Sequence, residues 1–279
     1  MSEASQIRPR VVLCTCGGLY GTLVLRHLRA SNRVDVCAVI QSTRVSTPRA
    51  GYFAGALTHV RRSGLAYAFY LWCATTFSEW LCTLARSEGG AAGVGAAKPP
   101  VHSTRNVNNA DGLRFLETFA PDYLVSAFFN QRLDPHLLAV PGRGCLNIHP
   151  SLLPEGRGVD PVFQALLRGT ARLGVTIHQM TPDLDTGPIV AQRAFDRRTP
   201  SSLFATTAFL FQEGAQLLAA ALDPTAPAAT ATEQSGSGSY QSWPTRLELR
   251  AYRARGGRLV RFVDLVRLAR GRFNGGSLS

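Results

Sequence analysis

The sequence predicts an α/β fold with a largely parallel sheet and helices on both faces of the sheet. Short apolar runs typical of buried strands alternate with segments of helical periodicity. The chain has 279 residues, 45% of them hydrophobic, which is enough for one large α/β domain with a small appendage. Ligands of such folds bind at the carboxyl ends of the strands. We therefore expect the loops after the strands ending near His149 and Met180 to converge on a site.

In the first half of the chain, the elements differ in how clearly their ends are marked. Residues 44–62 show no regular pattern, and residues 87–100 are rich in Gly and Ala and end in two prolines, which indicates a loop. Asn108 or Asn109 is a plausible cap for the helix that follows. The predicted strands are 10–14, 34–40 and 123–128, and the predicted helices are 19–30, 65–85, 109–119 and 134–140.

The second half continues the alternation and then changes composition. Its predicted strands are 144–149, 174–180 and 189–195, and its predicted helices are 161–167 and 201–222. We expect a main domain over 1–223, a low-complexity linker over 224–238 and a short, basic, helical C-terminal tail over 239–279. Residues 258–270 read as a basic amphipathic helix whose apolar face holds Leu259, Phe262, Val263, Val266 and Ala269.

The charge balance favours an anionic partner. The formal net charge is +12 and the pI about 10.2, values that suit a phosphate-bearing substrate, a polyglutamylated cofactor, nucleic acid or a membrane surface. Lys98 is the only lysine, so the sequence has no lysine-rich nucleic-acid tail. A biased composition is the alternative explanation of the same numbers.

The cysteines and the N-terminus favour a cytoplasmic protein. Six cysteines lie mostly in apolar runs, where Cys behaves as a small hydrophobe, so we expect all six to be reduced. Cys14 and Cys16 are too close for a Cys-x-x-Cys metal or redox site. Residues 1–10 lack the apolar stretch of a signal peptide.

Residues 65–85 form an apolar segment long enough to span a bilayer. Thr75, Thr76, Ser78 and Glu79 interrupt it, and a carboxylate near the centre of a span is costly in lipid. We expect a buried or half-buried helix. Contact with a membrane surface, through this segment or the C-terminal helix, is the alternative.

Three polar residues between positions 145 and 192 can carry chemistry. Asn147 and His149 alternate on one strand, so both side chains face the same side, and Pro150 ends the strand beside them. An amide next to an imidazole can stabilise an oxyanion. Asp185, in a turn-rich loop, can tune the imidazole or accept a proton. Spacing alone leaves a structural role for His149 open.

This stretch resembles the folate-dependent formyltransferases, which include glycinamide ribonucleotide, methionyl-tRNA and amino-sugar formyltransferases. The resemblance lies in Asn-x-His-Pro-Ser-Leu-Leu-Pro over 147–154, Gly-Val-Thr-x-His over 174–178 and Asp-x-Gly over 185–187. It implies a Rossmann-like formyltransferase fold and acyl transfer from 10-formyltetrahydrofolate to an amine. It assigns catalysis to Asn147, His149 and Asp185, and it suggests no metal.

The resemblance also implies two sets of binding residues. Gly17 and Gly18 fall on the loop near the acceptor substrate, and their spacing misses the dinucleotide pattern Gly-x-Gly-x-x-Gly. Arg157 and Gly158 match the tRNA and sugar enzymes, and we expect them to contact the substrate. Ser151 is not flanked by the Gly-x-Ser-x-Gly pattern of a nucleophile elbow, so we expect it to act as a turn residue. Residues expected near the folate are Phe128, Phe129, Asn130, Leu152, Leu153, Pro154 and Asp183.

Several functions remain open at this point. The leading hypothesis is N-formylation of a small-molecule amine, such as an amino sugar. A methionyl-tRNA formyltransferase is the alternative, although the 41 residues after the linker are too short for the tRNA-binding barrel usual in those enzymes. Hydrolysis of formyltetrahydrofolate and a non-catalytic binding role complete the set. The sequence does not indicate an oligomeric state.

Overall fold

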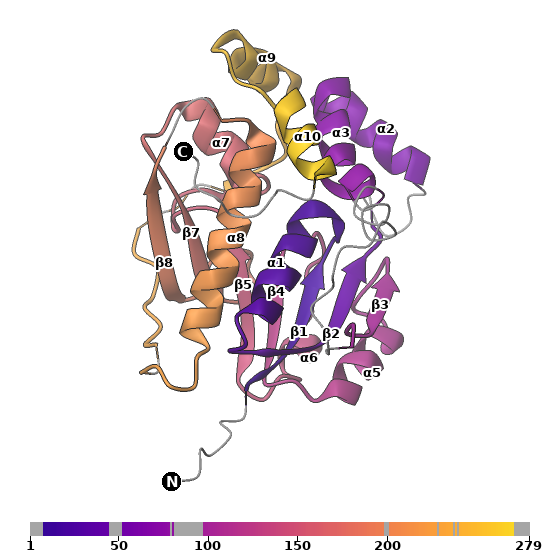
Figure 1. Cartoon of the computed structure of the whole chain (residues 1–279), viewed down its shortest axis with the longest axis vertical. Helices are drawn as coiled ribbons and strands as arrows, with labels where there is room; N and C mark the ends of the chain where they lie inside the picture. The colour runs from indigo at the N-terminus through magenta and orange to yellow at the C-terminus, as the bar shows by residue number, and fades with distance from the viewer. Residues whose placement is uncertain are drawn as a thin grey trace.

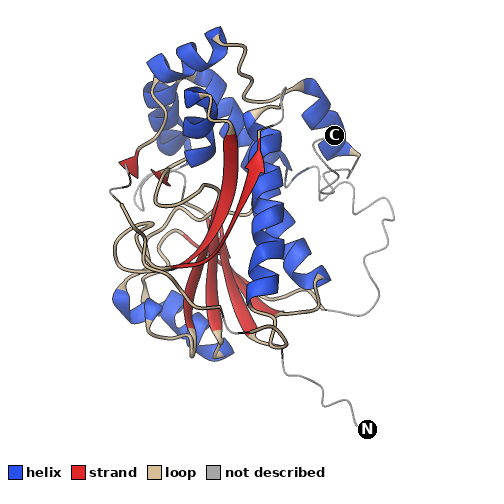
Figure 2. Cartoon of the chain, turned by 90° about the vertical axis from the view of Figure 1, so that its left-hand side faces the viewer, coloured by secondary structure: helices blue, strands red, loops and turns tan. Residues whose placement is uncertain are grey.

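A central sheet organises the molecule. The computed structural model describes residues 8–44, 52–78, 80, 97–197, 201–227, 229–236, 238 and 240–270. Within these residues, seven strands form one sheet in the order β3-β2-β1-β4-β5-β7-β8 (Figures 1 and 2). They are β1 (Arg10–Thr15), β2 (Asp35–Ser42), β3 (Val101–Thr104), β4 (Tyr123–Ala127), β5 (Gly144–His149), β7 (Arg172–Gln179) and β8 (Ile189–Asp196).

The sheet is mostly parallel, as predicted. Strands β1 to β5 run in one direction, whereas β7 is antiparallel to β5 and β8 is antiparallel to β7. The antiparallel pair follows from the chain: the loop 180–188 that joins β7 to β8 is too short for a crossover helix, so it forms a hairpin. Strand β3 is an addition to the predicted set.

Helices cover the sheet on both faces. The helices are α1 (Gly18–Ala30), α2 (Tyr52–Ser63), α3 (Leu65–Trp72), the π-helix η1 (Cys73–Phe77), α5 (Ala110–Phe119), α6 (Pro135–Leu138), α7 (Pro161–Arg168), α8 (Leu203–Ala221), α9 (Arg246–Ala254) and α10 (Phe262–Ala269). Helices α1 and α8 lie side by side on one face (Figure 1). Helix α5 packs near β2 and β3.

Side chains alternate between two hydrophobic cores because successive residues of a strand point to opposite faces. Leu13 and Ile148 join the core beneath α1 and α8, whereas Cys14 and Cys145 join the core beneath α5 and α6. Helix α8 approaches closely because Gly214 has no side chain: a Cβ there would lie 2.3 Å from Ile148 Cγ2. The cysteines of the described residues are free, and Cys82 lies outside them.

Helix α5 begins as its sequence predicts. The Asn109 side chain accepts a hydrogen bond from Gly112 N at 2.8 Å, which satisfies one of the unpaired amides of the first turn. By contrast, α2 lies within the segment 44–62 that was expected to be irregular, of which residues 45–51 are not described. The irregular prediction was therefore wrong for residues 52–62.

The apolar segment 65–85 is half-buried over its described part. Tyr67 and Tyr70 are buried, whereas Leu65 and Phe69 on the other side of α3 are exposed. Residues 79 and 81–85 lie outside the described residues. Across the described part of the chain, no helix combines the length and apolar character needed to span a bilayer.

Helix α10 buries a different face from the predicted one. It starts at Phe262, and its buried residues are Asp264 and Leu268, while Phe262 is 82% exposed. The reason is polar: the Asp264 carboxylate accepts hydrogen bonds from Ser202 Oγ at 2.6 Å and Arg261 N at 2.7 Å. The requirement to satisfy this buried carboxylate turns the apolar residues outward.

Residues 224–238, expected as a linker, run along the main domain. Thr232 exchanges two backbone hydrogen bonds of 2.8 Å with Ile189 of β8. Beyond this segment, the short strand β9 (Tyr240–Gln241) pairs with β6 (Arg157–Gly158). The domain boundaries stay a prediction, but these contacts tie the C-terminal segment to the loop that carries Arg157.

Candidate active site

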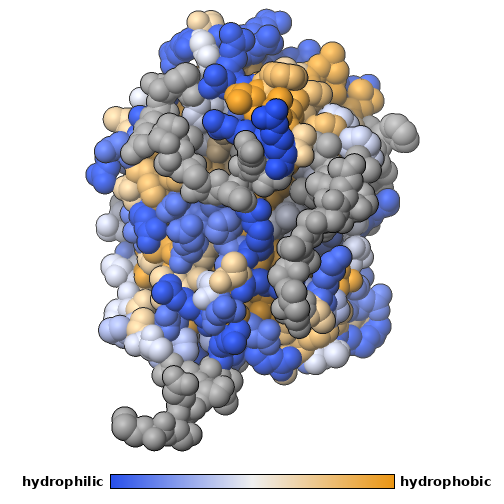
Figure 3. Space-filling view, viewed as in Figure 1, coloured by the Kyte–Doolittle hydropathy of each residue, from blue (hydrophilic) through white to orange (hydrophobic). Residues whose placement is uncertain are grey.

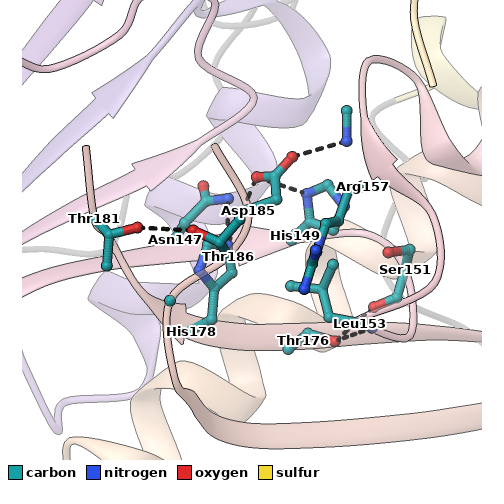
Figure 4. Close-up of polar contacts among 12 residues, drawn as sticks. Asn147, His149, Ser151, Leu153, Arg157, Thr176, His178, Thr181, Asp185 and Thr186 are labelled. Atoms are coloured by element: carbon teal, nitrogen blue, oxygen red, sulfur yellow. Dashed lines mark hydrogen bonds and ion pairs between the residues drawn. The ribbon is translucent and has the colours of Figure 1, made fainter. Parts of the chain in front are cut away.

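Two adjacent strands bring the predicted catalytic side chains to one face of the sheet. Asn147 and His149 alternate along β5 and point away from Ile148, which packs against α8. In the register of the antiparallel pair, Asn147 lies opposite His178 of β7. Directly paired residues share a face, so both histidines and the amide line one surface (Figure 4).

Asp185 reaches this surface by a route that the sequence did not predict. We expected the carboxyl ends of two parallel strands to meet, but β7 is antiparallel and leaves the sheet beside the start of β5, where Met180 N donates to Cys145 O. The loop after Met180 then folds back over the sheet. Asp185 Oδ1 lies 3.6 Å from His149 Nδ1 and 3.8 Å from His178 Nε2.

His149 has a backbone carbonyl at one ring nitrogen and the Asp185 carboxylate near the other. Its Nε2–H donates to the carbonyl of Gly156 at 2.9 Å, so the remaining ring nitrogen, Nδ1, is the one that faces Asp185. A carboxylate can only accept hydrogen bonds, so Asp185 offers an acceptor to this ring nitrogen. The His149 side chain is 6% exposed, which strengthens the interaction with Asp185 relative to water.

His178 is neutral and orients Asn147. Its Nδ1–H donates to the carbonyl of Gln179 at 2.8 Å, which leaves Nε2 as an acceptor for Asn147 Nδ2–H at 3.1 Å. Burial, followed by the neighbouring His149, lowers the pKa of His178 to about 4. The contact with Asp185 is therefore not an ion pair at neutral pH. In the sequence, His178 only ends the Gly-Val-Thr-x-His stretch, and its link to Asn147 emerges only in the fold.

Asp185 is held by a backbone amide and has an unusual backbone conformation. Its second carboxylate oxygen accepts Gly158 N–H at 2.8 Å, and its backbone has a left-handed φ of 57°. Few non-glycine residues adopt this conformation, and Asp is among those that tolerate it best. The predicted substrate residue Gly158 thus lies next to the carboxylate that the sequence predicts to be catalytic.

Gln234 is a site residue that the sequence did not reveal. Its Oε1 accepts hydrogen bonds from Arg157 Nε at 3.2 Å and Nη2 at 2.7 Å. Its Nε2 donates to the carbonyls of Asp185 at 3.0 Å and Gly187 at 2.8 Å. One side chain therefore joins the loop of Arg157 to the loop of Asp185. A single Gln in a low-complexity stretch carries no local signal of this role.

The loop 150–156 is fixed by hydroxyl groups. Ser151 Oγ lies within hydrogen-bonding distance of the carbonyls of Glu155 and Gly156, in agreement with the predicted turn role. Thr176 Oγ1 donates to Ser151 O at 2.7 Å and accepts from Leu153 N at 3.2 Å. The Leu153–Pro154 peptide bond is cis. These contacts hold the carbonyl of Gly156 in place for His149.

The residues expected near the folate occupy different environments. Phe128 packs its ring into the core, with its centroid 4.9 Å from Tyr20, and Asn130 bonds Ser42 Oγ and Arg44 O at 2.6 Å each. These two side chains are thus engaged within the fold. Phe129 packs against the core beneath α5 and α6. In the loop after β5, Leu152 lies against Gly174, Leu153 is buried and the carbonyl of Pro154 lies beside Gly238. The Asp183 side chain is 86% exposed.

Gly17 and Gly18 lie at the start of α1, both with positive φ. Gly18 is required because the π-helix η1 packs against it: a Cβ would lie 2.2 Å from the carbonyl oxygen of Ala74. The glycine pair therefore joins the N-terminus of α1 to the apolar segment.

The centre also has the composition of a metal site. Among the described residues, ligand atoms of His149, His178 and Asp185 lie within 4.8 Å of one another. Two imidazoles and a carboxylate can hold zinc or iron. Here His178 Nε2 already accepts a hydrogen bond from Asn147, and the second carboxylate oxygen of Asp185 accepts one from Gly158 N–H. The sequence did not suggest such a cluster.

A second buried carboxylate connects the site loop to the apolar segment. Asp160 caps α7 by accepting Phe163 N–H at 3.2 Å, and its other oxygen accepts the hydroxyl of Tyr67 at 2.6 Å. Burial raises the pKa of Asp160 to about 6, although both hydrogen bonds lower it. Asp160 lies two residues beyond Gly158 and so joins the site loop to α3.

Comparison with known proteins places this geometry in a family. Residues 78–215, which include all three predicted catalytic residues, match the family model described as formyl transferase. Methionyl-tRNA formyltransferase of Thermotoga neapolitana is 43% identical over 94 residues, covering 34% of this chain and 30% of that protein. The enzyme of the same name from Anaplasma marginale is 31% identical over 146 residues, covering 52% and 48%. The chain thus matches less than half the length of these relatives.

Solved structures share the fold at low sequence identity. A sugar N-formyltransferase from Shewanella sp. has a TM-score of 0.54 at 16% identity and covers 84% of this chain and 76% of its own. A phosphoribosylglycinamide formyltransferase from Bacillus halodurans has a TM-score of 0.50 at 21% identity and covers 77% and 93%. The matched residues and the shared fold support the resemblance of this chain to the folate-dependent formyltransferase family.

Proposed function

We propose that this chain transfers a formyl group from 10-formyltetrahydrofolate to the primary amine of a small molecule. The proposal rests on one observation: the amide of Asn147, the imidazole of His149 and the carboxylate of Asp185 converge on one face of β5 and β7. Donors beside a developing oxyanion, with a carboxylate behind them, are what acyl transfer to an amine requires.

Each residue has a distinct part in the proposed reaction. The nitrogen of the amine bonds to the formyl carbon, and the bond from that carbon to the folate nitrogen breaks. Asn147 and doubly protonated His149 donate hydrogen bonds to the formyl oxygen as it gains negative charge. Asp185 keeps His149 charged and, through water, accepts the proton that the amine loses. A proton returns to the folate nitrogen, so atoms and charge balance.

The binding residues complete the proposal. Arg157 is positioned by Gln234 beside the Asp185 loop, where its guanidinium suits an anionic group on the acceptor. Gly158 supplies the amide that holds Asp185. For the folate, Leu152, Leu153 and Pro154 form the loop next to the trio. Asp183, which is largely exposed on the neighbouring loop, is available for a polar contact.

A second acceptor, methionyl-tRNA, is favoured by the names of the curated relatives. The C-terminal residues 246–270 carry eight Arg against two acidic residues, a balance of +6 that suits phosphates. Solved structures named as a sugar N-formyltransferase and a phosphoribosylglycinamide formyltransferase share the fold of this chain over 84% and 77% of its length. We keep the small-molecule amine as the leading proposal.

Product analysis with a panel of acceptors tests the proposal. The protein is incubated with 10-formyltetrahydrofolate, alone and with nucleotide-linked amino sugars, other metabolite amines or charged methionyl-tRNA, and tetrahydrofolate and formylated products are measured. We expect release of tetrahydrofolate that requires one small amine. A requirement for methionyl-tRNA would select the second candidate. Release without any amine would indicate hydrolysis, and no turnover together with no folate binding would indicate a non-catalytic protein.

A further inference from the structure

Large apolar side chains are exposed along α3 and at the start of α10. Leu65 is 75% exposed, Phe69 51%, Trp80 56% and Phe262 82%. Figure 3 shows hydrophobic residues gathered at the top of the molecule, over α10 and the neighbouring α3, next to strongly hydrophilic ones. Several large apolar side chains that are exposed together on one surface typically mark a site of interaction with another molecule.

The aromatic rings of this surface form a continuous series. Phe69 and Trp72 have ring centroids 5.8 Å apart, Trp72 and Phe77 5.0 Å, and Phe77 and Trp80 5.9 Å. Trp72 and Phe77 thus each have a neighbouring ring on two sides. The series presents a wide apolar surface, but it leaves few ring faces for stacking on bases.

A groove joins this aromatic series to the C-terminal segment. It runs between α3 and the connection from α9 to α10, and Phe262 follows its last lining residue by two positions. Two arginines at the groove place positive charge beside the exposed rings. The lining residues are Ala66, Phe69, Arg253, Gly257, Arg258, Leu259 and Val260.

The charge of the surrounding elements is almost entirely positive. Residues 52–78 contain Arg61 and Arg62 and no acidic residue. Residues 246–270 contain eight Arg, and both acidic residues there are bonded within the fold: Glu248 in the cap of α9 and Asp264 beneath α10. The partner of this surface must therefore carry negative charge next to apolar groups.

We propose that the aromatic-basic face, defined by Leu65, Phe69, Trp80, Phe262, Arg253 and Arg258, docks the protein on an anionic lipid bilayer. Trp and Phe enter the headgroup region while Arg contacts lipid phosphates, which is how interfacial proteins bind. Exposed aliphatic residues such as Leu65 gain nothing from RNA but are stabilised in lipid. The proposal is independent of the reaction that the active site performs.

Vesicle co-sedimentation tests the proposal on the full chain. Vesicles of phosphatidylglycerol and phosphatidylcholine are compared with pure phosphatidylcholine at about 50 and about 300 mM salt. The test variants are the pair Leu65→Ser with Phe262→Ser and the pair Arg253→Gln with Arg258→Gln. The matched controls are Val101→Ser, an apolar residue 54% exposed on β3, and Arg105→Gln, an exposed residue next to β3. Circular dichroism verifies that each variant is folded.

The expected result has three parts. The unmodified protein sediments with anionic vesicles and far less with neutral ones. Each arginine removed weakens vesicle binding about fivefold and reduces its salt dependence. The apolar pair weakens binding about tenfold or more, and the controls leave it unchanged. Failure of the folded, unmodified protein to sediment with anionic vesicles would overturn the proposal. So would tRNA binding that both test pairs weaken while vesicle binding is absent, which would assign the face to RNA.

Discussion

The two sides of the active site are assembled from different parts of the chain. On one side, Asn147, His149 and Asp185 come from 39 consecutive residues, and the hairpin of β7 and β8 folds the carboxylate back over the strand. On the other side, Gln234 lies in a low-complexity stretch 49 residues beyond Asp185, and its side-chain amide bonds both the loop of Arg157 and the loop of Asp185. In the proposed reaction, the first side holds the groups that do the chemistry, whereas the second side holds those groups in place.

This difference predicts that losses on the first side are larger than losses on the second. The largest effect is expected for Asp185→Asn, because the amide cannot balance the charge on His149 or accept a proton. The rate of formyl transfer should fall by about 10²- to 10⁴-fold in kcat. Steady-state kinetics measure this, with Asp196→Asn, an exposed carboxylate at the end of β8, as the matched control. Equal activity of the two variants would contradict the assignment.

A smaller effect is expected at Asp160, where the loop meets α3. Its pKa of about 6 lies above the ordinary 3.8, so the folded state favours the protonated carboxyl. This group therefore stabilises the fold most at low pH, and the contribution is lost as the pH rises through 6. The difference between 3.8 and about 6 corresponds to about 3 kcal/mol.

Urea unfolding of the unmodified protein and of Asp160→Asn measures the pH-dependent contribution of Asp160 to the free energy of unfolding. Between about pH 4 and pH 7, the free energy of unfolding of the unmodified protein should fall relative to the variant by up to about 3 kcal/mol. Asp111→Asn, which alters an exposed carboxylate, should show no such trend. A constant difference between the protein and Asp160→Asn across this range would show that the carboxyl titrates normally.

The smallest effect is expected at Gln234, and two substitutions there separate its two contacts. Gln234→Ala removes both and should lower kcat/KM about tenfold, as the loss of neutral and charge-assisted hydrogen bonds suggests. Gln234→Glu can still accept from Arg157 but cannot donate to the carbonyls of Asp185 and Gly187. It should therefore lower kcat while the KM of the acceptor stays within about twofold.

The neighbouring exposed residue provides the control for this comparison. Glu233→Ala should leave both kinetic constants unchanged. If Gln234→Ala left kcat and KM unchanged, as expected for Glu233→Ala, the hydrogen bonds of Gln234 to the two loops would have no part in catalysis. If Gln234→Glu raised the KM as strongly as it lowered kcat, the two contacts would not be separable.

The sequence predicted the elements whose identity depends on local pattern. The alternating strands, the Asn109 cap and the face shared by Asn147 and His149 follow from periodicity and capping chemistry. Long-range contacts were not predictable in this way. The antiparallel direction of β7 and the orientation of Asn147 by His178 depend on which strands become neighbours. Similarly, the outward turn of Phe262 depends on a hydrogen bond from Ser202 to Asp264.

One measurement addresses the central claim most directly. The formyl group of 10-formyltetrahydrofolate is labelled, and its appearance on the acceptor amine is followed for the unmodified protein, Asn147→Ala, His149→Ala and the double variant. We expect amine-dependent transfer that falls by about 10²- to 10³-fold in each single variant and is abolished in the double variant. Folate binding should persist in all of them. Transfer that survives in the double variant would contradict the assignment of catalysis to this site.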